Sequence, residues 1–587
     1  MIPANSPLLV GLDQGAGADI FTTTNLTFSF GAAGTVIPDA DITGPRTTLT
    51  WTESQKQFVR DLFTYISTVV NLNFTETTQV DTANINFQQV SDFTDGTTGY
   101  QQSLGPGTQQ SVLVIPTDFI DLDDVTLIHE IGHALGLAHP HDGNLFPGVD
   151  NEQDSGDFGL NTELATRMSY VAGASAPHPG LDIIGESSTF GAIDLAKLHL
   201  LYGPNPNAGA GNTVYGDTPV LVTILDSGGQ DLIDFSGAGD NVVIDLRAAT
   251  LQVEEGGGGY LSFISRDDGA RAQGGYTIAF DTVIEDARGG QGNDMITGNA
   301  ATNLLSGNGG NDMIDGGAGA DTALYSGTQS NYTLTLSAAG TTVQDRRGTD
   351  GTDTITNVEA LAFGDNTGGP FDLTVFAGTQ NLSETAMESF IELYIAYFNR
   401  APDAVGLNFW GTAFANGTTL QQMATLFTDQ DETRATYAAD LSNADFVTAV
   451  YSNVLGRQGD QAGFDFWVGV LDSGGRTRDQ FILSVLEGAK AAPPAGATPE
   501  FMQQQLADQQ YLSIKTDIGA YYSVTRGLSD VPQATAVMNL FDGSAGSVNT
   551  AQAAIDSFYN DALDAENGQF LMQLVGVVDD PFGGALV

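Results

Sequence analysis

Apolar residues in the first two hundred positions recur with strand spacing in some stretches and helical spacing in others. Residues 26–30 (Leu-Thr-Phe-Ser-Phe) alternate apolar and polar side chains, which predicts a half-buried strand. From Glu53 to about Asn71 the apolar residues follow the helical period, and Thr52-Glu-Ser-Gln55 forms a capping box before them. We therefore expect a helix there. Residues 83–87 and 112–115 predict two further strands.

Glycine recurs every nine residues later in the chain. Four consecutive nonapeptides begin at Gly289, Gly298, Gly307 and Gly316 and follow the pattern G-G-x-G-x-D-x-U-x, in which U is apolar. This repeat predicts a parallel β-roll, in which six residues form a glycine-rich turn and three form a short strand. A flexible glycine-rich linker is the alternative, which the strict register disfavours. The carbonyl and carboxylate oxygens of such turns are the ligands that Ca²⁺ prefers.

Successive turns of a β-roll lie on alternate sides, so the ligands of one ion come from turns two repeats apart. We expect Asp294 and Asp312 to share one side and Asn303 and Asp321 to share the other. Because the second repeat lacks its acid, the ion beside Asn303 is expected to bind more weakly. The expected calcium-binding positions in the repeats are Gly290, Gly292, Asp294, Asn308, Gly310, Asp312, Gly317, Gly319 and Asp321.

From about residue 381 the pattern becomes helical and contains a second repeat. Residues 394–410 and 451–467 are copies of one another in which Tyr, Arg, Asp, Gly and Trp recur at a fixed interval. Both copies contain an arginine and an aspartate expected to lock a turn between two helices, and a tryptophan expected to anchor a core. The pairs are Arg400 with Asp403 and Arg457 with Asp460, and the tryptophans are Trp410 and Trp467.

These patterns predict a multidomain protein with three parts. We expect an α+β domain over residues 1–205, a parallel β-roll over residues 206–375 and a mostly α-helical repeat domain over residues 376–587. The last part resembles an uncharacterised helical module of some bacterial exported repeat proteins. A spacer or surface anchor is favoured there over a second active site, because no catalytic constellation occurs in it.

The charge of the chain limits the classes of molecule that it can bind. The 587 residues include 19 basic and 72 acidic side chains, for a formal net charge of −53. Such a surface repels nucleic acid and anionic membranes and suits divalent cations, although plain solubility accounts for much of the acidity. The absence of cysteine excludes disulfides and thiolate metal sites. No apolar run predicts a transmembrane segment, and the first residues do not resemble a cleavable secretory signal.

One stretch, from His129 to His139, carries the strongest candidate chemistry. Its pattern is H-E-x-x-H-x-x-G-x-x-H and holds three of the six histidines of the chain. On a helix, His129 and His133 share one face, and Gly136 can adopt the positive φ that turns His139 back toward them. Three imidazoles and an open position are typical of a catalytic zinc site, with Glu130 able to reach a water there. The alternatives are chance polar residues on a core helix or a degenerate, metal-free relative.

About thirty residues later the chain contains Met168-Ser169-Tyr170. The long zinc motif followed by Met-Ser-Tyr resembles the metzincin endopeptidases, and within them the serralysin branch, over roughly residues 20–330. The resemblance implies that Met168 forms a tight turn beneath the zinc and that Tyr170 is a switchable zinc ligand that stabilises the transition state. Without it, Met168 would be interpreted as core and Tyr170 as a surface residue. The family usually has Trp after this Tyr, so Val171 suggests a different pocket beyond the turn.

The same resemblance adds candidate positions outside the two motifs. It implies further calcium ligands before the repeats, at Asp226, Gly228, Gly229, Asp231 and Glu285. The C-terminal stretches 570–576 and 585–587 have some likeness to uncleaved signals of type I secretion. Of the other histidines, His199 is interpreted as a partly buried core residue, and His141 and His178 as solvated loop residues, although either could position substrate.

Together these features predict a secreted, extracellular zinc endopeptidase that acts on proteins or peptides and is exported by the type I secretion machinery. Glu130 is the expected general base, and Zn²⁺ and several structural Ca²⁺ ions are the expected cofactors. Residues 99–101 predict either an edge strand that an extended substrate could join or an ordinary hairpin. The rival hypothesis is a calcium-dependent surface-layer or adhesion protein with an inactive protease fold, which the intact motif disfavours.

Overall fold

The computed structural model describes residues 1–14, 20–37, 45–91, 99–103, 109–117, 124–173, 182–184, 189–266, 271–348, 350–365, 369–564 and 566–583. Within it the chain forms two compact units, residues 1–321 and 322–587. His178 and residues 585–587, to which the sequence assigned roles, lie outside the described residues. Among the described residues, no helix has the length and apolar character needed to cross a membrane.

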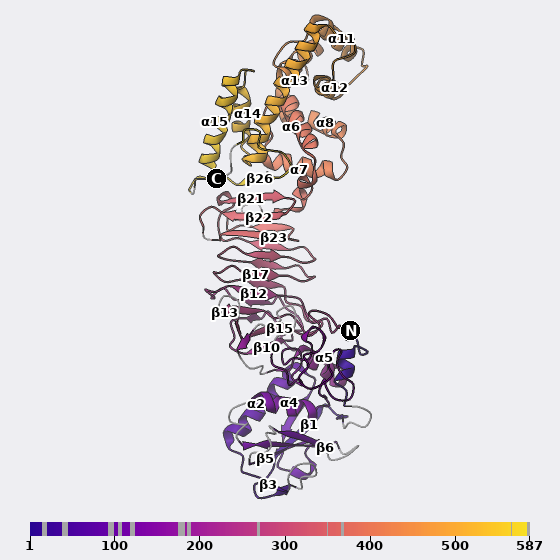
Figure 1. The fold of residues 1–587 in the computed structure, drawn as a ribbon, viewed down its shortest axis with the longest axis vertical. Coiled ribbons are helices and arrows are strands. Elements are labelled where there is room, and N and C mark those ends of the chain that lie inside the picture. Colours follow the sequence, from indigo (N-terminus) through magenta and orange to yellow (C-terminus); the bar gives the residue numbers. More distant parts are fainter. Residues whose placement is uncertain are drawn as a thin grey trace. The chain divides into compact units, whose positions relative to one another are not determined.

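A five-stranded sheet organises the first part of the first unit (Figure 1). The strand order is β4-β1-β5-β7-β6, and every neighbouring pair is parallel except β6 and β7, which are antiparallel. The strands are β1 (Asn25–Phe30), β4 (Asn73–Glu76), β5 (Ile85–Val90), β6 (Tyr100–Ser103) and β7 (Ser111–Pro116). The strands predicted near residues 26–30, 83–87 and 112–115 are therefore present. Tyr100 and Gln101 belong to β6, which is an edge strand and pairs antiparallel with β7; pairing of a substrate with this edge stays a prediction.

In the described part of the chain, four helices accompany this sheet, together with the antiparallel pair of β2 (Val36–Ile37) and β3 (Arg46–Thr47). The helices are α1 (Pro7–Gly11), α2 (Glu53–Val69), α4 (Asp124–Ala134) and α5 (Ala192–Tyr202). The predicted capping box begins α2: the Thr52 hydroxyl accepts from the Gln55 amide, and the Gln55 side chain accepts from the Thr52 amide. The helix ends two residues before the predicted Asn71.

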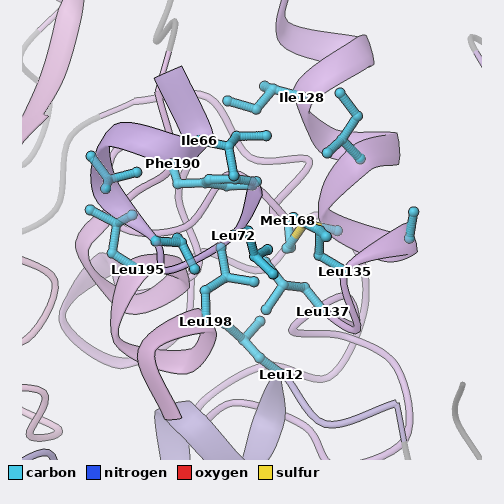
Figure 2. Close-up of a cluster of buried hydrophobic side chains, with 14 of the residues drawn as sticks. Leu12, Ile66, Leu72, Ile128, Leu135, Leu137, Met168, Phe190, Leu195 and Leu198 are labelled. Carbon is cyan, nitrogen blue, oxygen red and sulfur yellow. The ribbon is translucent and has the colours of Figure 1, made fainter. Parts of the chain in front are cut away.

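One apolar core joins these helices to the sheet. Figure 2 shows Met168 in this core close to Leu135 and Leu137, which follow α4. Gly132 of α4 makes room for the methionine, because a Cβ at this position would lie 2.7 Å from Met168 Sδ and 3.3 Å from the Phe190 ring. The side chain of Met168 therefore packs directly against the helix that carries the first two histidines of the motif.

Short strands form the β-roll part of the first unit. One sheet contains β18-β16-β11-β9, and another contains β19-β17-β12-β13-β14-β8. The strands are β8 (Asp182–Ile184), β9 (Val214–Tyr215), β11 (Leu232–Asp234), β12 (Val242–Asp245), β13 (Phe263–Arg266), β14 (Arg271–Gln273), β16 (Asp286–Arg288), β17 (Met295–Thr297), β18 (Leu304–Ser306) and β19 (Met313–Asp315). A separate parallel pair consists of β10 (Leu221–Ile224) and β15 (Gly275–Ile278).

The repeats of the roll alternate between the two sheets, as the nine-residue period predicts. Asp286 pairs with Leu304 in one sheet, and Met295 pairs with Met313 in the other. Each strand is thus bonded to the strand two repeats away rather than to the next one along the chain. The central residue of each of these strands is buried and fills the space inside the roll: Ala287, Ile296, Leu305 and Ile314.

The second unit begins with strands and continues as helices. Its strands are β20 (Thr322–Leu324), β21 (Tyr332–Ser337), β22 (Gly340–Asp345), β23 (Thr352–Thr356), β24 (Ala360–Ala362), β25 (Phe371–Asp372) and β26 (Leu571–Val575). The C-terminal strand β26 pairs in parallel with β21. Most of the stretch likened to an export signal, residues 570–576, is therefore a sheet strand in this fold.

The helices of the second unit confirm a mostly helical region after residue 381. They are α6 (Glu384–Phe398), α7 (Ala404–Ala415), α8 (Leu420–Thr428), α9 (Asp431–Thr436), α10 (Asn443–Leu455), α11 (Gln461–Asp472), α12 (Arg478–Lys490), α13 (Pro499–Ala520), α14 (Val531–Asn539) and α15 (Ala545–Ala562), with a π-helical turn at Tyr521–Thr525. Each predicted copy is a helix–turn–helix pair, α6 with α7 and α10 with α11.

The turns of the two copies are held in related ways, but one predicted pair is wrong. Asp403 and Asp460 each cap the second helix of their copy by accepting a backbone amide. Arg400 lies 3.3 Å from Asp403, as expected, and also contacts Glu432. Arg457 instead makes its ion pair with Asp508 of α13 at 2.5 Å. The partner of Arg457 lies 51 residues away along the chain, so it could not be found from the local repeat.

The two tryptophans occupy matching but incompletely buried positions. Trp410 packs edge-on against Phe427 with ring centres 5.2 Å apart, and Trp467 packs in the same way against Phe481 at 5.2 Å. Both tryptophans keep part of their surface exposed, so each lies at the border of a core rather than at its centre.

Candidate metal centre

The end of α4 is built to turn the chain back toward the helix. Gly136 has φ +103°, a conformation that residues with a Cβ rarely adopt. The Leu137 amide donates to the Gly132 carbonyl, and the Gly136 amide donates to the His133 carbonyl. These two bonds form a Schellman motif, which closes the helix and redirects the following residues. The predicted role of Gly136 thus matches its place in the fold.

The three histidines of the motif converge on one point. Their Nε2 atoms are 3.0–3.1 Å apart in all three pairs. In a tetrahedral zinc site with Zn–N bonds of about 2.0–2.1 Å, ligand nitrogens lie roughly 3.3 Å apart. The distances between the three nitrogens therefore agree, within a few tenths of an ångström, with those expected when all three bind one zinc ion.

The outer nitrogen of each ring determines which tautomer faces that point. Nδ1 of His129 lies 2.9 Å from the Arg167 carbonyl, and Nδ1 of His133 lies 2.8 Å from the Leu137 carbonyl. A carbonyl only accepts, so both Nδ1 atoms carry the proton and both Nε2 atoms offer a lone pair. Nδ1 of His139 lies 2.6 Å from an Asp142 carboxylate oxygen, which has the same effect.

Burial keeps these imidazoles neutral, as metal ligands must be. It lowers the pKa of His129 and of His139, and it lowers the pKa of His133 to about 4. The neighbouring imidazoles act in the same direction, because each disfavours a second positive charge. Three converging lone pairs repel one another, and a cation at their centre would relieve this repulsion.

Glu130 and Tyr170 complete a cavity of about 510 Å³ beside the cluster. Glu130 is 5% exposed, and its Oε2 atom is buried without a hydrogen-bond partner among the described residues. Burial raises the pKa of Glu130 to about 8, a shift that a nearby cation would oppose. The Tyr170 hydroxyl lies 2.8 Å from His139 Nε2, and burial raises the pKa of this phenol to about 12. The unpartnered carboxylate and the three nitrogens together fit a zinc ion with one open position.

Two supports of the cluster were missed in the sequence. Asp194, at the start of α5, accepts hydrogen bonds from the Thr166 hydroxyl and from the Arg167 amide, and so fixes the carbonyl that orients His129. Gln14 donates from one carboxamide to the His133 carbonyl and to the Leu137 carbonyl, both at 2.8 Å. Neither residue belongs to a recognisable motif, and each reaches the cluster only through tertiary contacts.

The other histidines take different places. His199 donates from Nε2 to the Val69 carbonyl at 2.9 Å and is partly buried, as expected of a core histidine. Because a carbonyl only accepts, this nitrogen carries the proton. His141 stacks on His139 with ring centres 4.8 Å apart and planes 11° apart, and it also packs against Tyr170. It therefore adjoins the cluster rather than standing free in solvent.

The expected calcium positions of the roll lie in the predicted arrangement. The Asp294 amide donates to Asp312 Oδ1 at 2.8 Å on one side, and the Asn303 amide donates to Asp321 Oδ1 at 2.7 Å on the other. Asp294, Asp312 and Asp321 are all buried. A Cβ at Gly289 would lie 2.3 Å from Asp294 Oδ2 and 2.7 Å from the Gly307 carbonyl, so oxygens crowd this glycine. This oxygen-lined space between buried carboxylates fits Ca²⁺.

The other residues expected to bind calcium differ in their hydrogen-bond partners and backbone conformations. Asp226 accepts from the Tyr215 hydroxyl and the Gly228 amide, and the Asp231 amide donates to Glu285 Oε2. Asp231 Oδ2 is buried without a hydrogen-bond partner among the described residues, which fits a cation ligand. The positions with positive φ are Gly228, Gly229, Gly310, Gly317, Gly319 and Asn308. Gly290 donates its amide to Asp294, and Gly292 packs against Asn241.

Comparisons with known proteins bear on both units. Residues 199–370 match the family described as the C-terminal domain of peptidase M10 serralysins, and residues 424–492 match a domain of unknown function (DUF4214). Metallopeptidase AprA of Pseudomonas marginalis is 32% identical over 269 residues, covering 41% of this chain and 53% of the relative. Serralysin of Photorhabdus luminescens is 31% identical over 264 residues, covering 40% and 51%. Serralysin B of Dickeya chrysanthemi is 31% identical over 312 residues, covering 48% and 60%.

The chain spans about half the length of the curated relatives it matches. Residues 199–370 match the serralysin C-terminal domain, and the chain resembles serralysins at about 30% identity, so the resemblance predicted from the motifs is confirmed. Within the helical region predicted as an uncharacterised module, residues 424–492 match a family of unknown function.

Proposed function

We propose that this protein is a secreted, zinc-dependent endopeptidase with a metzincin catalytic domain over about residues 1–205. The convergence of His129, His133 and His139 beside a buried glutamate is the observation that carries the proposal. The resemblance to named metallopeptidases supports the same class of activity. Tyr170 is proposed as an additional, exchangeable zinc ligand, because its hydroxyl already lies against the cluster.

The residues around the cavity divide the work of peptide hydrolysis. When bound, a zinc ion would polarise the scissile carbonyl and make a water more acidic. Glu130 accepts the proton of the attacking water and passes it to the leaving nitrogen. Tyr170 remains protonated at neutral pH, because its pKa is raised to about 12, and so can donate a hydrogen bond to the oxyanion. Asp142 accepts from His139 Nδ1 directly, whereas Asp194 positions the Arg167 backbone, whose carbonyl accepts from His129 Nδ1.

An extended peptide has a place to bind beside these groups. Tyr100 and Gln101 line the cavity, and they belong to the edge strand β6. An edge strand can pair with the backbone of a substrate in an extended conformation. We propose that protein or peptide substrates bind in this way, which presents a backbone carbonyl to Glu130 and Tyr170.

The β-roll supplies the proposed calcium dependence. Its buried aspartates repel one another without a cation, which disfavours the folded roll where calcium is scarce. Binding of calcium outside the cell would favour folding through linkage. We propose export through the type I secretion machinery in the unfolded state, with the helical module available for attachment to a cell surface or surface layer.

Casein digestion with and without a zinc chelator tests the enzymatic proposal. We expect the full chain in calcium to digest casein, to lose this activity when zinc is removed and to regain it when zinc is restored. The calcium concentration stays constant, so the roll is unaffected. A protein that binds zinc and folds but digests neither casein nor other unfolded proteins would instead support the rival, a surface-layer or adhesion protein with an inactive protease fold.

The change Tyr170→Phe removes only the hydroxyl beside His139. We expect kcat to fall about 10²-fold with little change in KM, because the lost hydrogen bond forms in the transition state. Zinc content, measured by atomic absorption, should remain at one ion per chain, since three imidazoles remain. An unchanged kcat would remove Tyr170 from the mechanism.

A further inference from the structure

We infer that the turn of residues 298–303 takes no calcium ion against the preceding turn on its side of the roll, because two asparagine carboxamides there replace the ion. The inference rests on the calcium role proposed for the roll and excludes one pair of turns from that role. It concerns the space between this turn and the turn that ends at Glu285, which lies 18 positions before Asn303.

The sequence of this turn departs from the calcium pattern at three positions. It is Gly-Asn-Ala-Ala-Thr-Asn, so Asn299 and Ala301 replace glycines and Asn303 replaces the acid. The loss of the acid alone would weaken a site. The added carboxamide of Asn299 changes the kind of contact, since an –NH₂ group donates hydrogen bonds where a cation needs free oxygens.

Asn299 uses both hydrogens of its amide on backbone oxygens. Its Nδ2 atom lies 2.7 Å from the Ile284 carbonyl and 3.1 Å from the Leu246 carbonyl. Its Oδ1 atom accepts from the Ala301 amide at 2.8 Å. The Ile284 and Leu246 carbonyls, which could otherwise bind a cation, therefore already accept hydrogen bonds from the neutral Asn299 side chain.

Asn303, at the other end of the turn, also forms hydrogen bonds where the ion would otherwise bind. Its side chain donates from Nδ2 to the Glu285 carbonyl at 2.9 Å and accepts at Oδ1 from the Asn299 amide at 2.9 Å. The residue is 1% exposed, so little water competes with these bonds. The Glu285 carboxylate is turned away, because its Oε2 atom accepts from the Asp231 amide. Of Asn299, Asn303 and Glu285, only Glu285 has a carboxylate, and this carboxylate does not face the space between the two turns.

The neighbouring turns on the opposite side show the contrast. There Asp294 and Asp312 are both buried, and two backbone amides donate to Asp294. Asn308 occupies the position equivalent to Asn299 and donates to the Gly289 carbonyl at 2.6 Å, but its turn retains Asp312. A buried dication needs negative charge nearby to offset its lost hydration, and the Asp294–Asp312 side has that charge.

Calcium counting on the full chain tests the inference. We expect the double variant Asn299→Gly/Asn303→Asp to bind one more calcium ion per chain than the unaltered protein in equilibrium dialysis with ⁴⁵Ca. Asn293→Gly is the control, since it removes an exposed carboxamide from a turn that keeps its acid, Asp294, and it should leave the number unchanged. Asp312→Asn should lower the number.

Each outcome bears on one of the two proposals. A double variant that binds the same number of ions as the unaltered protein, while Asp312→Asn binds fewer, overturns the inference. If Asp312→Asn also binds the same number, the calcium role of the roll fails instead. Where the double variant does not fold, Asn299→Ala replaces it. Its Tm should fall by the same amount at every calcium concentration, and a fall that changes with calcium would make Asn299 part of an ion site.

Discussion

Replacing Glu130 by alanine is expected to abolish peptide hydrolysis while zinc remains bound. The three imidazoles and their Nδ1 partners do not involve this carboxylate, so metal affinity should change little. Without it, the described residues that line the cavity include no buried carboxylate to take the proton of the attacking water, which should cost about 10²–10⁴-fold in kcat. Casein digestion and zinc content measured on the same sample check both parts of this result.

The exposed Glu152 offers a matched control for that experiment. Glu152→Ala removes the same charge from a nearby loop and should retain full activity. Activity that survives in Glu130→Ala would take Glu130 out of the mechanism. Loss of zinc together with activity would show that the glutamate acts on the metal rather than on the substrate.

Removal of calcium is expected to unfold the β-roll. The buried side chains of Asp226, Asp231, Asp294 and Asp312 would then face one another without a cation. Each tenfold excess of free calcium over its dissociation constant stabilises the folded state by about 1.4 kcal/mol per ion, and several ions act together. A calcium-selective chelator, with zinc kept constant, should abolish most of the β-sheet circular dichroism of the roll.

Restoring calcium should recover the spectrum, whereas magnesium should not. Magnesium demands a tighter octahedral arrangement and gives up its water reluctantly. A spectrum that does not change in the chelator would contradict the β-roll proposal, although it would leave the zinc site untouched.

The parts of the fold that depend on local sequence were predictable. The capping box at Thr52 began α2 at the expected residue, and the nine-residue period gave the alternation of β16 to β19 between sheets. The three histidines could be placed together because the helical spacing and Gly136 determine the direction of their side chains within eleven residues. Such features need no knowledge of distant segments.

The parts that depend on distant partners were not predictable. The sequence predicted an ion pair of Arg457 with the nearby Asp460, but in the structure Arg457 forms its ion pair with Asp508. The repeat around Arg457 does not indicate this partner. The support of His129 by Asp194 passes through a backbone carbonyl, which has no signature in the side chains. The strand β26 was not predicted, because its partner β21 lies more than two hundred residues earlier.

The pairing of β17 with β19 and of β16 with β18 has a consequence for how such a roll can change in length. Loss or gain of a single nonapeptide would move every strand that follows to the opposite sheet, although these strands would still pair with one another two repeats apart. Only an even number of nonapeptides keeps each later strand in its original sheet. Natural variation in this segment should therefore proceed by duplication or deletion of 18-residue blocks, a parity rule that arises from hydrogen bonding alone.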